Sequence, residues 1–118
     1  YLDDYKEAAT YFGIVVKHKP KQIAGWESFI KCLIANEQYD AALEQTELAY
    51  MSTQGKVIFV YYRSAILFMM QKRKEGLLQL EMALSKSGKW LNKLIKFYPE
   101  LIQDPKVVEL ISQYKKPR

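Results

Sequence analysis

The residues of this chain that could take part in catalysis or metal binding are few and far apart. His18 is the only histidine and Cys32 the only cysteine among 118 residues. His18 lies between two lysines just before Pro20, where a histidine at a helix end interacts with exposed carbonyl groups. No second metal ligand lies at helical spacing from it. A single cysteine cannot form an internal disulfide, so we expect Cys32 to be buried and inert.

The carboxylates and loops give no stronger indication of chemistry. Asp3 and Asp4 are adjacent, and neighbours on a helix point about 100° apart, so the pair fits a helix start better than a catalytic pair. The sequence has no glycine-rich phosphate loop and no Gly-x-Ser-x-Gly motif. We therefore predict that the chain is not an enzyme and uses no cofactor and no metal ion.

Apolar residues recur every three or four positions along almost the whole chain, which indicates amphipathic helices. The apolar stripes run through residues 5–15, 23–34, 39–50, 57–70, 77–84, 90–98 and 107–111. Asp104-Pro105 provides an N-cap and a proline at the first position of the last helix. The most apolar stripe is interrupted by Arg63 and Ser64 and is too short for a membrane span. Short connections favour antiparallel neighbours, so we predict an all-α fold of about seven helices.

A repeat of 34 residues runs through these helices. It is carried by Tyr5, Ala8 and Phe12, which recur as Tyr39, Ala42 and Thr46, and by Gly76 and Ala83, which follow Ala42 and Ala49. A small residue thus occupies the same position three times, and two helices approach closely only where one offers a small side chain. Two helices in each 34-residue period are the signature of a helical solenoid.

The middle repeat resembles the tetratricopeptide repeat (TPR) family. The residues at the family's Trp-x2-Leu-Gly-x2-Tyr and small–aromatic–small positions are Trp26, Phe29, Ile30, Leu33, Ala42, Thr46 and Ala49. The resemblance implies one TPR-like domain over 1–118, folded as a short right-handed α-solenoid. Residues 1–20 would be the second helix of a truncated repeat, 21–54 a full repeat, 55–88 a degenerate repeat and 89–118 C-terminal capping helices. Ile30, Thr46 and Arg63 depart from the family pattern, so we expect looser packing there.

The resemblance also implies a binding surface, on the concave face formed by the first helices of successive repeats. The predicted partner-binding residues are Glu27, Lys31, Ile58, Tyr61, Tyr62, Ala65 and Met69. An apolar patch with a charged rim can receive an extended peptide or a helix, so we predict a non-catalytic scaffold that binds a protein or peptide. In the alternative, the capping helices fold over this face and bury Ile58, Tyr61 and Met69.

The net charge of +5 gives a second functional alternative. Residues 1–85 carry ten Lys/Arg and ten Asp/Glu, whereas residues 86–118 carry eight and three. The basic residues at this end are Lys86, Lys89, Lys93, Lys96, Lys115, Lys116 and Arg118. They could bind nucleic acid or an acidic partner. We favour a protein partner because lysines seven residues apart also fit an ordinary solvated helix face.

The segment from Phe97 to Tyr114 is similar to the ends of certain bacterial TPR proteins, many of which work in the cell envelope. We therefore expect the chain to be the C-terminal part of a bacterial TPR protein. The cell envelope or periplasm is the expected compartment, with the cytoplasm as the alternative. An open helical face at the N-terminal end could also pair with a second copy, so self-association is a further alternative.

Overall fold

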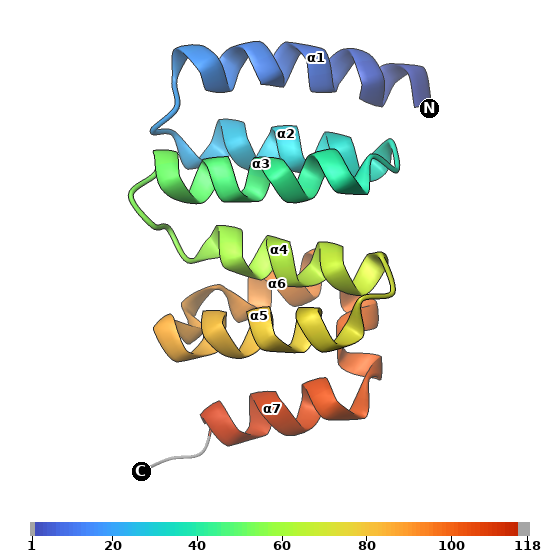
Figure 1. Ribbon diagram of the computed structural model, residues 1–118, viewed down its shortest axis with the longest axis vertical. Helices are drawn as coiled ribbons and strands as arrows, with labels where there is room; N and C mark the ends of the chain where they lie inside the picture. Colours follow the sequence, from blue (N-terminus) through green and yellow to red (C-terminus); the bar gives the residue numbers. More distant parts are fainter. Residues whose placement is uncertain (1, 116–118) are drawn as a thin grey trace. The chain divides into compact units, whose positions relative to one another are not determined.

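The computed structural model describes residues 2–115, and the side chains of residues 4–114. These residues form seven α-helices and two 3-10 helices, without a strand among them (Figure 1). The elements are α1 (Leu2–His18), α2 (Ile23–Ala35), α3 (Tyr39–Ser52), α4 (Ile58–Met69), α5 (Arg73–Lys86), η1 (Gly88–Trp90), α6 (Leu91–Phe97), η2 (Pro99–Gln103) and α7 (Pro105–Lys115). The predicted all-α fold of about seven helices is therefore confirmed.

The chain divides into two compact units, Tyr1–Phe59 and Val60–Arg118. In the first unit α2 packs against both α1 and α3, and the three helices run antiparallel to one another in sequence order (Figure 1). In the second unit α7 packs against α5 and η2, and α6 packs against η1 and η2. The helices of each unit thus pack with their neighbours along the chain, as expected. The right-handed stacking of the whole chain and its single-domain organisation stay predictions.

The α2–α3 and α4–α5 turns share one main-chain geometry at an interval of 34 residues. Glu37 and Gln71 both have a positive φ, of 59° and 64°. The N–H groups of Glu37 and Gln38 donate to carbonyl groups three and five residues earlier, and those of Gln71 and Lys72 do the same. This is the Schellman pattern, which satisfies the last carbonyl groups of a helix. The predicted repeat therefore has a structural counterpart in its turns.

Within the second unit α4 and α5 approach closely at Gly76. A Cβ atom at Gly76 would lie 2.9 Å from Cδ2 and Cε2 of Phe68. The buried Ser64 hydroxyl donates to the Gly76 carbonyl oxygen at 2.9 Å. Ala42, in the same position of the repeat, is fully buried, whereas Ala8 is half-buried and its neighbour Ala9 is buried. The predicted role of small residues at the helix crossing is thus met at Gly76, and Ala42 is buried as that role requires.

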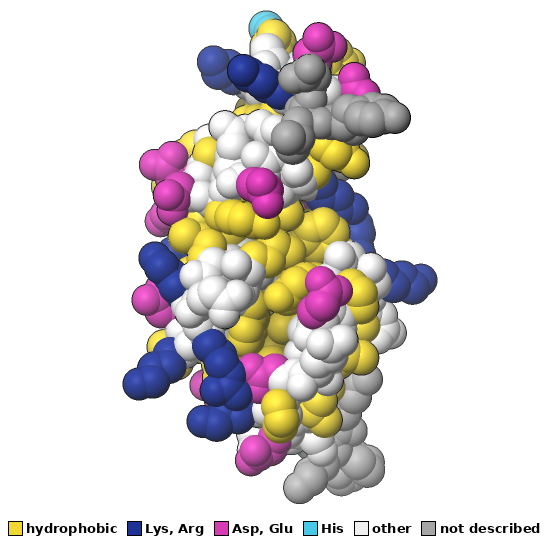
Figure 2. Space-filling view, turned by 90° about the vertical axis from the view of Figure 1, so that its right-hand side faces the viewer, with side chains coloured by type: hydrophobic (Ala, Val, Ile, Leu, Met, Phe, Trp, Pro, Cys, Tyr) yellow, Lys and Arg dark blue, Asp and Glu magenta, His cyan; other side chains and the backbone are white. Residues whose placement is uncertain are grey.

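The residues that depart from the family pattern still contribute to the core. Ile30 and Thr46 are fully buried. The Thr46 hydroxyl donates to the carbonyl oxygen of Leu43 at 2.6 Å, so this polar group is satisfied inside the fold. Other hydrophobic side chains remain at the surface, and Figure 2 shows them among charged side chains on one face.

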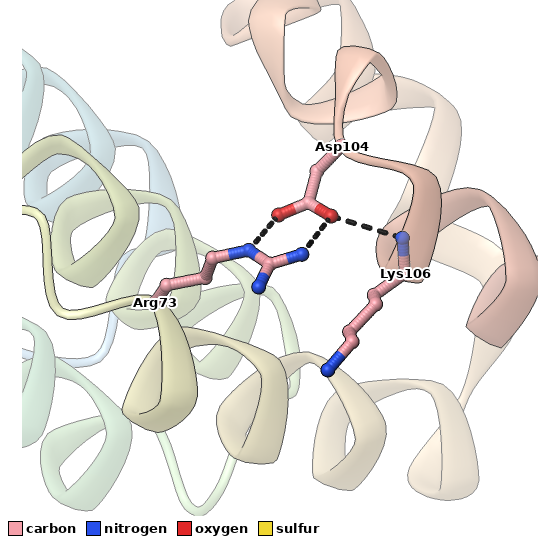
Figure 3. Close-up of polar contacts among 3 residues, drawn as sticks. All are labelled: Arg73, Asp104 and Lys106. Atoms are coloured by element: carbon pink, nitrogen blue, oxygen red, sulfur yellow. Dashed lines mark hydrogen bonds and ion pairs between the residues drawn. The ribbon is translucent and has the colours of Figure 1, made fainter.

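Asp104 joins the start of α7 to the start of α5, as the predicted N-cap (Figure 3). Its Oδ1 accepts a hydrogen bond from the Lys106 N–H at 2.9 Å, which satisfies a free donor of the first turn. Arg73 donates to the same carboxylate through Nε at 2.5 Å and Nη2 at 2.7 Å. The hydrogen bonds from Arg73 are the main reason that the pKa of Asp104 falls from 3.8 to about 2. One carboxylate therefore both caps α7 and ties it to α5.

The first prediction concerns the crossing of α4 and α5. Gly76→Ala should lower the free energy of unfolding by about 1–2 kcal/mol, because its new methyl group would force the Phe68 ring to move. The matched control is Gly13→Ala in α1, where the new Cβ would lie 3.5 Å from the nearest atoms, at ordinary contact distance. Removing a helical glycine there should instead stabilise the fold by about 0.5–1 kcal/mol. Urea denaturation measures both, and a stabilised Gly76→Ala protein would contradict the close approach.

The second prediction concerns the Asp104 carboxylate. Asp104→Ala should cost about 1 kcal/mol near neutral pH because the N-cap is lost, and Asp104→Asn should cost less because asparagine also caps helices. The folded-state pKa is lowered, so the carboxylate's contribution is present above about pH 4 and is lost as the pH falls through about 2. Between these values the wild type should lose stability more steeply than Asp104→Asn in urea titrations. Equal slopes would contradict the charged contact with Arg73.

Candidate functional site

Most of the residues predicted to bind a partner lie in the core. Tyr61, Tyr62, Ile58 and Ala65 are at most 1% exposed, and Glu27 is 9% exposed. Met69 is half-buried and Lys31 is exposed. A fully buried side chain cannot contact a partner, so the four core residues do not form an open binding surface in this structure. This is the alternative in which the predicted face is covered, with Met69 only partly so.

The C-terminal segment covers part of α4 within the second unit. The Tyr62 ring meets the Phe97 ring of α6 edge to face, with 5.3 Å between the centroids. The Tyr61 hydroxyl donates to the Ser87 carbonyl oxygen at 2.5 Å, and burial raises the pKa of Tyr61 to about 12. These two tyrosines therefore hold the segment after α5 and α6 against α4.

The few candidates for chemistry are not gathered into a site. Cys32 is half-buried rather than fully buried as expected, and burial raises the pKa of its thiol, which disfavours the reactive thiolate. His18 is exposed at the last position of α1, where the sequence predicted a helix end. Within residues 2–115 no group of three or more His, Cys, Asp and Glu could hold a metal ion. None of the helices in this part of the chain has the length and apolarity needed to cross a membrane.

The first unit contains a groove of about 720 Å³ between α1 and α3, with α2 as its floor. Each helix contributes residues at helical spacing, so one face of each helix turns toward the groove. The α1 wall contains Lys6, Thr10, Gly13, Ile14 and Lys17; the floor contains Trp26, Phe29 and Leu33; the α3 wall contains Gln45, Leu48 and Ser52. The size lies within the range of known ligand-binding clefts, roughly 300–1,000 Å³.

The groove is open to solvent and apolar along its middle. Ile14 is 53% exposed and Leu48 is 49% exposed, one on each wall. The half-buried Phe29 lies between them on the floor. Trp26 is buried, and its Nε1–H donates to the Pro20 carbonyl oxygen at 2.8 Å, which fixes the indole at one end of the groove. Exposed apolar side chains in a preformed groove are a common mark of an interaction site.

Sequence reasoning missed this surface because it assigned binding to the first helices of the repeats. The walls of the groove are instead α1 and α3, the second helices of the expected repeats. A signal was present in the 34-residue period, because Ile14, Leu48 and Met82 are apolar and occupy the same position of the repeat. All three are at least 44% exposed. An apolar residue repeated at a position outside the helix crossing therefore indicates surface rather than core.

The basic C-terminal helices present a different arrangement. Lys86, Lys89, Lys93 and Lys96 are exposed. The ammonium groups of Lys89 and Lys93 lie 4.9 and 5.6 Å from the centroid of the Trp90 ring, within cation–π range. The remaining basic positions, Lys115, Lys116 and Arg118, lie outside the residues whose side chains the structure describes. The tryptophan ring is thus already engaged by lysines of its own segment.

Comparison with known proteins adds no family to these observations. No protein-family model, no curated protein and no solved structure matches this chain. The residues that line the groove of the first unit therefore carry the functional inference.

Proposed function

We propose that this chain is a non-catalytic protein-interaction module of the tetratricopeptide type. Its binding surface is the groove between α1 and α3, and its ligand is an amphipathic helix of a partner protein. The observation that carries this proposal is the pair of half-exposed apolar side chains, Ile14 and Leu48, that face each other across the half-buried Phe29. Neither the position of this surface nor its ligand follows from the family resemblance, which pointed to the other face of the repeats.

The assignment to the tetratricopeptide type is supported by the period of the helical hairpins. The same Schellman turn follows α2 and α4 at an interval of 34 residues. A small residue, Ala42 or Gly76, stands five residues after each left-handed turn residue. A 34-residue period built from two helices is the length typical of this type of repeat.

The shape and chemistry of the groove favour a helix over an extended peptide. Its walls and floor are helices, whose backbone N–H and C=O groups are largely paired within each helix. An extended peptide in the groove would have few backbone partners and would leave its own polar groups unsatisfied, at a cost in free energy. An amphipathic helix pairs its own backbone and presents only side chains, which is the usual mode of helix-in-groove recognition.

The basic helices of the second unit support nucleic-acid binding less well. Aromatic side chains bind single-stranded nucleic acid by stacking on the bases. A base that stacked on Trp90 would compete with the ammonium groups of Lys89 and Lys93, which already lie over the ring. We therefore prefer the groove as the main site.

The third prediction tests the groove with a displayed library of helical peptides. Selection on the wild-type chain should enrich peptides with an apolar stripe of period three to four. Ile14→Glu with Leu48→Glu should weaken binding of these peptides by about 30-fold or more, because charges enter the apolar centre of the interface. Both residues are about half exposed, so the variant should stay folded. Fluorescence anisotropy gives the affinities, and circular dichroism checks the fold.

The matched control places the same charges on the same two helices outside the groove. Tyr11 in α1 is 63% exposed and Met51 in α3 is 70% exposed, and neither is among the groove-lining residues. Tyr11→Glu with Met51→Glu should leave peptide affinity within about threefold of the wild type, as is typical of changes outside an interface core. The proposal fails if no peptide is enriched, or if both variants bind the enriched peptides as well as the wild type does.

A further inference from the structure

We infer that the groove selects an acidic amphipathic helix, whose carboxylates lie along the edge that faces α1. This inference rests on the proposed function and names the chemistry of its partner. It depends on three features of the groove, namely the charge of its two walls, the spacing of the charges on one wall, and the open ring on its floor.

The two walls of the groove differ in charge. Among the described residues that line it, Lys6 and Lys17 carry full charges, and both belong to α1. The α3 wall contributes the uncharged Gln45, Leu48 and Ser52. No carboxylate is among the described lining residues, so an acidic edge of a ligand meets no repulsion from the lining itself. A bound helix should therefore place its carboxylates toward α1 and its amide or hydroxyl side chains toward α3.

The two lysines also set the length of the ligand. Lys6 and Lys17 are eleven residues apart on one helix, which is about three turns or roughly 16 Å. A partner helix lying along α1 would need carboxylates about eleven residues apart to meet both ammonium groups. A helix shorter than about three turns would meet only one of them.

The floor of the groove places an apolar anchor between the two charged ends. Gly13 lies on the α1 wall between Lys6 and Lys17. A Cβ atom at this position would lie 3.5 Å from Cε1 and Cζ of Phe29. Because glycine has no side chain, the edge of the Phe29 ring can be reached from the groove. The partner helix should therefore carry a large apolar residue between its two carboxylates, and this residue should pack against Phe29.

The fourth prediction is a charge swap. A library of helical peptides of about 18 residues carries Glu, Gln or Lys at the positions along one edge of a randomised apolar stripe. The wild-type chain should enrich glutamate at two positions about eleven residues apart, whereas Lys6→Glu with Lys17→Glu should enrich lysine there. The acidic peptides should bind this variant about tenfold more weakly at low salt, and the difference should shrink at high salt.

The control for the charge swap makes the same change in net charge elsewhere in the first unit. Lys19 and Lys56 are exposed and do not line the groove. Lys19→Glu with Lys56→Glu should keep the preference for glutamate and change affinity by less than about threefold, which is the size of an exposed charge effect. Circular dichroism and urea denaturation of all variants show whether the fold is kept.

The outcomes separate the partner chemistry from the proposed function. Peptides that lose affinity on Ile14→Glu with Leu48→Glu but show no preference for glutamate would overturn the acidic partner and leave the groove as the site. Peptides insensitive to both pairs of groove substitutions would overturn both proposals. Light scattering tests a second copy as the occupant, since a dimer that the Ile14→Glu and Leu48→Glu changes dissociate would replace the acidic partner with self-association.

Discussion

The close approach of the two helices within a hairpin is the constraint on which the rest of the structure depends. Gly76 is the clearest case, because a single methyl group there would meet the Phe68 ring at 2.9 Å. Gly25 has a similar role in the first unit, where a Cβ atom would lie 3.3 Å from Cγ1 of Val15. Helices that pack this closely direct their larger apolar residues into the adjoining spaces. The positions of the core side chains follow from where the small residues stand.

This packing also explains why a groove forms in the first unit. Because α2 packs against both α1 and α3, it becomes the floor between two walls that run in the same direction (Figure 1). The apolar residues of the walls that do not face the helix crossing, Ile14 and Leu48, are then left about half exposed. The surface that we propose for binding is thus a by-product of how the hairpin is built, and its specificity comes from the lysines and the glycine added to one wall.

The parts of the structure that depend on local sequence could be predicted, and the parts that depend on distant contacts could not. Helix positions follow from apolar spacing, and the start of α7 follows from Asp104-Pro105, since both are set within a few residues. The burial of Tyr61 and Tyr62 depends on Ser87 and Phe97, which follow them by 26 and 35 residues. Nothing near the tyrosines indicates that contact, so the binding face was placed on residues that belong to the core.

The paired turns at Glu37 and Gln71 carry a consequence for how such a chain changes over time. Their shape depends on main-chain hydrogen bonds and on one residue in the left-handed region, and neither position is glycine. Side chains elsewhere in the hairpin can then be exchanged while the pitch between hairpins is preserved, provided that a small residue remains at the crossing. Descendants of one ancestral hairpin can in this way lose all recognisable identity and still superpose, so shared ancestry would be easier to trace in backbone angles than in letters.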